Sequence, residues 1–114
     1  MKYMMMMWAE GDATGGTKED FEAWADFEQE ARDTGVYLDG GAFQSPGDGR
    51  LVRTTLSGAD LGDAVKTGTF SPGPVQIAAF YLLRCEDLGE ATVWANRLPT
   101  YGSVEVRELV EYEF

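Results

Sequence analysis

Two strongly apolar segments dominate the pattern of the chain, one at its start and one near residue 80. Lys2 to Trp8 is apolar at nearly every position, which is typical of a strand with both faces covered. Gln76 to Arg84 shows the same property on two alternating sets: Ile77, Ala79, Tyr81 and Leu83 on one face, Ala78, Phe80 and Leu82 on the other. The pattern therefore predicts two central strands of one sheet.

Two further segments have the helical period, and each follows a capping residue. Thr17 and Asp20 form a capping-box pattern, and Gly35 is expected to end this helix in the left-handed conformation. A second helix is predicted after Asp87, with Glu90 completing its box. The apolar positions that recur on the inner faces of these helices are Phe21, Trp24, Phe27 and Ala31 in the first, and Leu88, Ala91, Trp94, Ala95 and Leu98 in the second, which Pro99 stops.

Weaker alternating patterns complete the fold. They predict strands over Val36–Phe43, Leu51–Leu56 and Gly102–Leu109, and a short strand or extended segment over Ala64–Phe70. The order β-α-β-β-β-α-β predicts an α+β fold, a ferredoxin-like sandwich with both helices on one face of the sheet, in a single domain over residues 1–114. The other apolar face would then be bare, which a soluble monomer does not tolerate. We therefore predict a homodimer in which a second copy covers this face.

The composition of the chain argues against several kinds of partner and site. Nine basic and twenty acidic residues give a net charge of -11, which disfavours nucleic acid and anionic membrane surfaces as partners. The chain has no histidine and a single cysteine, Cys85. A Ser-His-Asp triad, a Cys-His dyad, a histidine-ligated metal and an intrachain disulfide are thereby excluded. The lone cysteine, together with an apolar start too short for a signal peptide or membrane span, predicts a cytoplasmic protein. No cofactor is predicted.

Four stretches, in their order and spacing, carry a family resemblance. They are the opening MKYMMMMWAEGD; Thr34-Gly35-Val36 followed by Asp39-Gly40; Phe80-Tyr81-Leu82 followed by Glu86 to Ala91; and Gly102 to Arg107. Over essentially the whole chain they resemble the YCII-related family, in its DGPF-domain branch. The resemblance implies a ferredoxin-like subunit, a dimeric α/β barrel on association, and an intracellular bacterial protein of mostly undefined activity.

The signature of that branch is altered here. Where members have D-G-P-F, this chain has Thr67-Gly68-Thr69-Phe70, which keeps only the glycine and the phenylalanine. Gly41 stands where the family usually has an acidic residue, and the His–Asp dyad of the broader family lacks its histidine. The acid–base groups that the resemblance would imply are therefore missing.

The altered signature is still a candidate ligand site. Lys66, Thr67, Thr69 and Phe70 are predicted to line the rim of a cleft between the subunits, with Lys66 available for an anion and the threonines for polar groups. The alternative is a simple turn in which Gly68 provides backbone freedom and Phe70 packs. Arg107 is a further candidate for ligand binding.

The remaining candidates are individual charged or reactive side chains. Glu105 and Arg107 share a face of the last strand, where they form either a structural ion pair or a polar site. Arg53 and Arg84 are candidates for recognising a carboxylate, or are solvent-facing edge residues. Cys85 is interpreted as a small buried hydrophobic residue. Three carboxylates near strand ends have no known metal-loop spacing, so no metal site is predicted: Glu10, Asp12 and Asp39.

Two functions are compatible with these residues. The first is a non-catalytic homodimer that binds a small, mostly apolar ligand or a protein partner, because no catalytic groups converge in the sequence. The alternative is a small cofactor-independent enzyme of the lyase, isomerase or dehalogenase type, with Glu105, Asp39 or Tyr81 as the acid–base group in the dimer cleft. The missing signature aspartate and the absence of histidine favour the first.

Overall fold

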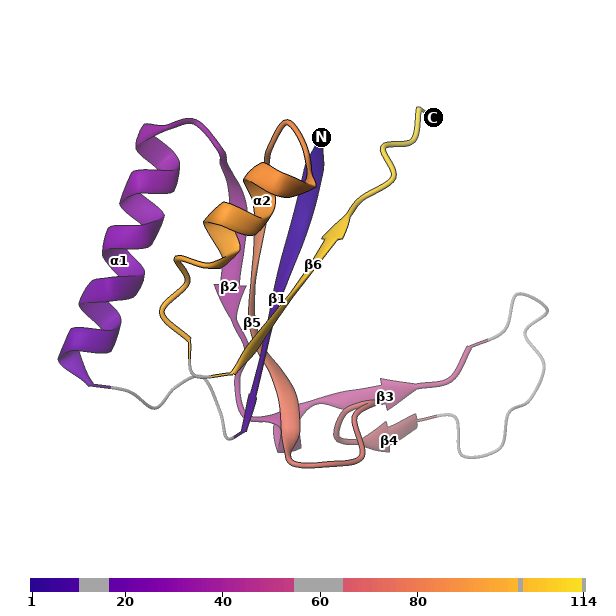
Figure 1. Ribbon diagram of the computed structural model, residues 1–114. Coiled ribbons are helices and arrows are strands. Elements are labelled where there is room, and N and C mark those ends of the chain that lie inside the picture. The colour runs from indigo at the N-terminus through magenta and orange to yellow at the C-terminus, as the bar shows by residue number, and fades with distance from the viewer. Residues whose placement is uncertain (11–16, 55–64, 101, 114) are drawn as a thin grey trace.

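One four-stranded antiparallel sheet and two helices form the body of the protein (Figure 1). This computed structural model describes residues 1–10, 17–54, 65–100 and 102–113. The strand order is β2-β5-β1-β6, with bounds β1 Lys2–Glu10, β2 Tyr37–Ala42, β5 Val75–Arg84 and β6 Ser103–Glu108; the helices are α1 Lys18–Asp33 and α2 Leu88–Ala95. The predicted α+β class is confirmed, and the order of elements is compatible with a ferredoxin-like fold.

Between β2 and β5 the chain leaves this sheet and forms a separate hairpin. A 3₁₀ turn, η1 (Pro46–Asp48), leads into β3 (Arg50–Val52), which pairs with β4 (Val65–Thr67). Figure 1 shows that the hairpin projects from one end of the sheet, away from α1. We call residues 50–54 and 65–70 the arm. The strand predicted at Leu51–Leu56 is confirmed at Leu51 and Val52. Residues 53 and 54 lie outside β3, so the prediction is wrong there, and residues 55 and 56 lie outside the described residues.

The helices begin and end where their capping residues predict. The Thr17 hydroxyl accepts a hydrogen bond from the Asp20 amide at 3.2 Å, and the Asp20 carboxylate accepts one from the Thr17 amide at 3.0 Å, which confirms the capping box. Gly35 has φ +81° just after α1. In α2, Asp87 caps the Glu90 amide at 2.8 Å. The Glu90 carboxylate accepts from Glu86 and not from the capping residue, so the second box differs from the predicted one.

The core lies between the sheet and the two helices. Its buried residues are Tyr3, Met5, Met7, Phe27, Ala31, Ala79, Tyr81, Leu83, Cys85, Ala91, Trp94 and Leu98. The ring of Phe27 joins both helices to the sheet, with its centroid 5.8 Å from that of Trp94 and 5.2 Å from that of Tyr81. Of the other residues on the predicted inner faces, Trp24 and Ala95 are partly buried against the core. Phe21 and Leu88 lie in the first turns of their helices and are each 55% exposed.

A β-bulge changes the face on which Ile77 lies. Met7 pairs with Ala79 and Trp8 with Ile77, so Ala78 is an extra residue in β5. Because side chains alternate along a strand, Ile77 shares a face with Trp8 and not with Ala79. The prediction that Ile77 shares a face with Ala79, Tyr81 and Leu83 is therefore wrong. An extra residue reverses the alternation beyond it, and the sequence carries no signal of it.

Neither helix covers the second face of the sheet. Six partly exposed apolar side chains of the two central strands form it, and we call it the open face: Met4, Met6, Trp8, Ile77, Phe80 and Leu82. The ring of Phe43 extends it at one end, with its centroid 6.1 Å from that of Phe80. The prediction of two-sided apolar strands with helices on one side only is confirmed. Neither of the two described helices is long and apolar enough to cross a membrane.

Candidate functional site

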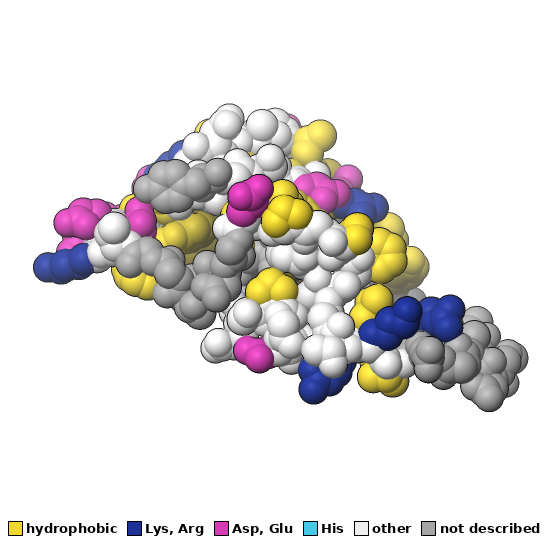
Figure 2. All heavy atoms as spheres, turned by 90° about the horizontal axis from the view of Figure 1, so that it is seen from below, with side chains coloured by type: hydrophobic (Ala, Val, Ile, Leu, Met, Phe, Trp, Pro, Cys, Tyr) yellow, Lys and Arg dark blue, Asp and Glu magenta, His cyan; other side chains and the backbone are white. Residues whose placement is uncertain are grey.

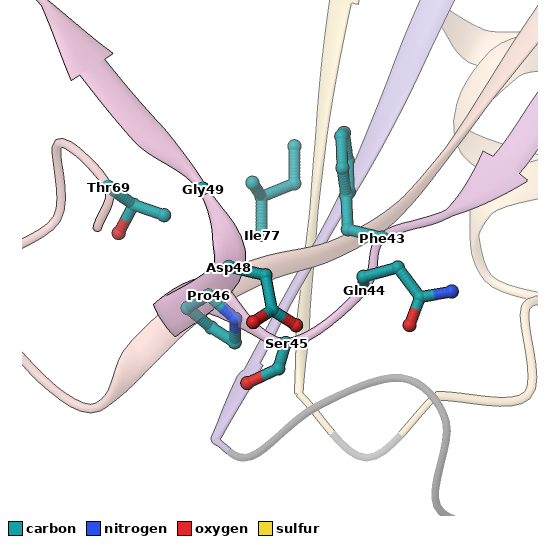
Figure 3. A pocket seen from close by; sticks show the side chains of 8 residues that line it. All are labelled: Phe43, Gln44, Ser45, Pro46, Asp48, Gly49, Thr69 and Ile77. Atoms are coloured by element: carbon teal, nitrogen blue, oxygen red, sulfur yellow. The ribbon is translucent and has the colours of Figure 1, made fainter. Parts of the chain in front are cut away.

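The open face ends at a hollow of about 260 Å³, at the place where the sheet meets the arm (Figure 3). Phe43 and Ile77 belong to neighbouring segments of the body, and their side chains point the same way in Figure 3. The lining residues are Phe43, Gln44, Ser45, Pro46, Asp48, Gly49, Thr69 and Ile77. Most of the lining surface is apolar, with polar groups at the side, which suits a small apolar molecule.

The buried amide of Gln76 positions the arm beside this hollow. Its Nε2 donates to the carbonyl oxygens of Ser71 at 3.1 Å and Gly73 at 2.8 Å, and its Oε1 accepts from the Thr69 hydroxyl. A buried amide requires such partners, so the loop between β4 and β5 is tied to the start of β5. Thr69 is thereby held at the wall of the hollow.

Gly68 lies at the base of the arm and has a backbone conformation that favours glycine. Its φ of +109° lies in the region that favours glycine, and its amide donates to the carbonyl oxygen of Gly49 at 3.0 Å. The backbone freedom expected of Gly68 is thus confirmed. The packing expected of Phe70 is not found within one subunit, because this side chain is 86% exposed.

The structure separates the candidate ligand-binding residues. Only Thr69 lines the hollow. Lys66 and Thr67 lie in β4, where both are exposed. Arg107 lies in β6 opposite Met4 and therefore on the open face, at the other end of the sheet. Phe43 and its neighbours were not predicted from the sequence as lining residues. The signal for them was the Pro- and Gly-containing turn at residues 45–49, which directs the chain away from the strand.

Glu105 stands on the open face and contacts its largest side chain. It pairs with Met6 across the strands, and its Oε1 accepts a hydrogen bond from the Trp8 indole Nε1 at 3.1 Å. Arg107 shares its face, as predicted. Among the described residues no ion pair joins Arg107 to Glu105 or to another carboxylate. Both side chains are exposed.

The acid–base candidates do not come together. Tyr81 lies in the core, where burial, followed by the charge of Glu28, raises its pKa to about 12. A general base requires a pKa near the working pH, so Tyr81 is a packing residue. Asp39 lies in β2 and accepts from the Gly40 amide at 2.8 Å. Strands β2 and β6 are the two edges of the sheet, so about 14 Å of sheet width separates Asp39 from Glu105.

The remaining candidate residues are Cys85, Arg84, Arg53 and the carboxylates considered for a metal site. Cys85 is buried, and burial raises the pKa of its thiol, which agrees with a small hydrophobic residue. Arg84 and Lys2 each lie 3.9 Å from the Glu111 carboxylate. In the part of the chain that the structure describes, no three Cys, Asp or Glu side chains are grouped closely enough to hold a metal ion. Asp12, one of the three carboxylates considered above, lies outside that part, and Arg53 lies in the arm.

Comparison with known proteins identifies no family for this chain. The chain matches no protein-family model, and a search of curated proteins finds no match. The resemblance to the YCII-related family and its DGPF-domain branch therefore stays a prediction. Function has to be argued from the open face, the hollow and the charges around them.

Proposed function

We propose that the protein is a homodimeric, non-catalytic binding module. Two copies pack their open faces together, in the manner of a dimeric α/β barrel, and a small, mostly apolar ligand binds in the hollow at the end of the interface. The observation that carries this proposal is the open face itself. Its six apolar side chains form one continuous patch on the two central strands, and such patches in soluble proteins mark interaction sites.

The charges around the open face support a second copy as its partner. Register places three cations beside it, Lys2, Arg84 and Arg107. Four carboxylates lie beside it as well: Glu10, Asp39, Glu105 and Glu111. The charges of this border nearly balance, although the whole chain has a charge of -11. A symmetric interface brings the same patch against itself. A border with nearly balanced charges can pair its own charges there, whereas a strongly acidic one would repel its copy.

The positions of the acid–base groups support binding without turnover. Asp39 and Glu105 lie on opposite edges of the sheet, and Tyr81 points into the core. Catalysis by general acid and base requires such groups within hydrogen-bonding reach of one substrate. The walls of the hollow instead offer apolar surface from Phe43 and Ile77. These features favour recognition of an apolar molecule.

Sedimentation velocity over a range of protein concentrations tests the dimer. We expect wild type to sediment as a dimer at micromolar concentration and Leu82→Glu to sediment as a folded monomer, because the charge falls in the middle of the open face. Val93→Glu is the matched control, since Val93 is 61% exposed on α2, on the helix side of the sheet. It should leave the dimer unchanged. A monomeric wild type would overturn the proposal.

Saturation-transfer NMR with indole as the probe tests the hollow. We expect indole signals to be attenuated by wild type and by Val93→Glu, and not by Ile77→Glu, which places a charge in the apolar wall. Equal attenuation by all three proteins would show that the hollow is not the binding site. Native mass spectrometry of the purified protein gives a direct check, because a retained small molecule appears as added mass on the dimer.

A further inference from the structure

We infer that the arm of each copy packs against the C-terminal segment, Leu109–Glu113, of the second copy. The inference rests on the proposed dimer and extends its interface beyond the open face. It follows from three properties of the described residues. The arm is too small to be stable alone, and it is basic and apolar. The C-terminal segment is acidic and apolar, and it lies near the opposite end of the sheet.

None of the described residues of the arm is buried. β3 and β4 have three residues each and pair only with one another, in the register Arg50–Thr67, Leu51–Lys66 and Val52–Val65. A lone two-stranded hairpin is at best marginally stable in water. The apolar side chains of the arm are nevertheless exposed: Val52 by 52%, Val65 by 60% and Phe70 by 86%. A hairpin of this kind is stabilised when another surface covers it.

The arm is also basic, in an acidic chain. From Arg50 to Phe70 the sequence has three of the nine basic residues and two of the twenty acidic ones, Asp60 and Asp63, which lie outside the described residues. The rest of the chain has six basic and eighteen acidic residues. Figure 2 shows dark blue side chains beside yellow ones along the arm. An acidic and apolar surface is therefore the complement of the arm.

The C-terminal segment has this composition. Val110 is 71% exposed and Tyr112 70%, and the exposed carboxylates of Glu108 and Glu113 flank them. Among the described residues neither of these two carboxylates has an ion pair. Lys66 likewise has no such pair within the described ranges. The third carboxylate, Glu111, is already placed between Lys2 and Arg84 at the border of the open face.

A two-fold axis brings the two surfaces together. The arm joins the sheet where β5 begins at Val75, whereas the C-terminal segment follows Glu108, which pairs with Tyr3 near the opposite end. Both lie on the side of the open face, as the hollow and the pairs of Glu111 show, and both extend away from α1 in Figure 1. A two-fold axis that lies between the two facing sheets and runs perpendicular to the strands exchanges the two ends of the sheet. Each arm then meets the C-terminal segment of the other copy, twice in the dimer.

Carbodiimide cross-linking tests this contact in the unmodified protein. The reagent activates a carboxylate, the Lys66 amine displaces the activating group as a urea, and an amide bond forms with net loss of water. We mix ordinary copies with copies labelled with heavy nitrogen and analyse the peptides by mass spectrometry. The expected product joins Lys66 to Glu108 or Glu113 in peptides of mixed isotope. Lys66→Arg, which keeps the charge and removes the amine, should lose the product and keep the dimer.

Dissociation constants give a second, independent readout. We expect Phe70→Ser to raise the dimer dissociation constant about tenfold or more, whereas Val93→Ser leaves it unchanged. Lys66→Glu should weaken the dimer, and adding Glu113→Lys should restore it, because the exchanged charges meet across the interface. A dimer without mixed-isotope products from Lys66, or without an effect of Phe70→Ser, overturns the arm contact and leaves the proposed dimer standing. A monomeric wild type overturns both.

Discussion

The two faces of the sheet use the same amino acids in different surroundings. On β1, Met5 and Met7 are 0% and 1% exposed beneath the helices, whereas Met4 and Met6, at the alternate positions, are partly exposed on the open face. Their side chains have the same hydrophobicity, so the difference comes from the cover alone. Strands that are apolar on both sides are typical of a sheet with two covered faces, and the described residues cover only one face of β1 and β5. The open face is therefore the surface to which the proposed second copy is assigned.

The largest expected difference between the faces is that between Leu83→Ala and Leu82→Ala. Leu83 is fully buried, so its truncation should lower the free energy of unfolding by about 3 kcal/mol. Leu82 is its neighbour on the open face, and its truncation should lower the free energy by less than about 1 kcal/mol in dilute protein. Urea denaturation at several protein concentrations measures both.

The concentration dependence sharpens this result. The proposed dimer would stabilise the folded state by mass action, so the loss caused by Leu82→Ala should grow as the protein concentration rises. The loss caused by Leu83→Ala should not depend on it in this way. Equal losses for the two variants at every concentration would contradict the distinction between a covered and an open face.

Two adjacent glycines of β2 provide the next comparison. A Cβ atom at Gly40 would lie 2.4 Å from Cδ1 of the buried Tyr81 ring, whereas one at Gly41 would lie 3.5 Å from Phe80 Cε1 on the open face. We expect Gly40→Ala to lower the free energy of unfolding by about 2 to 3 kcal/mol through overpacking. Gly41→Ala should change it by about 0.5 kcal/mol or less, since the new contact is an ordinary one. Thermal unfolding followed by circular dichroism distinguishes them, and a larger loss for Gly41→Ala would contradict the assigned register.

The smallest expected effect concerns alkaline stability. The pKa of Tyr81 is raised from 10.0 to about 12, chiefly by burial. Above pH 10 the unfolded state therefore loses the phenolic proton while the folded state keeps it, so stability falls as the pH rises from 10 towards 12. The contribution of Tyr81 to this fall is on the order of 2 kcal/mol. Tyr81→Phe should show a shallower loss between pH 9 and pH 11 (on the order of 1 kcal/mol less,) than wild type in urea denaturation.

Two other tyrosines should account for the loss of stability that remains at alkaline pH in Tyr81→Phe. The pKa values of Tyr3 and Tyr37 are also raised, first by burial, so wild type and Tyr81→Phe should both lose some stability at alkaline pH. Ultraviolet absorption of tyrosinate provides the control, because it follows ionisation directly. Identical alkaline slopes in the two proteins would place the Tyr81 hydroxyl in contact with water and outside the covered face.

Local interactions determined much of what could be predicted from the sequence. The capping residues Thr17 and Asp87, the stop at Gly35 and the two-sided strands β1 and β5 were all predicted correctly, because each depends on neighbours within a few residues. The candidate ligand residues are separated by the fold. Thr69 lines the hollow, whereas Lys66 lies in β4 of the arm. The predicted cleft between subunits stays a prediction.

Only the tertiary structure decided which side chains share a face or a pocket. The bulge at Ala78 moved Ile77 to the open face, and the pairing of β3 with β4 carried Lys66 away from the sheet. These outcomes depend on contacts between residues far apart in the chain, for which no local pattern exists. By itself the sequence determined the elements, their caps and the two-sided apolar pattern of the central strands. The tertiary structure decided which face the helices leave open and where the arm lies.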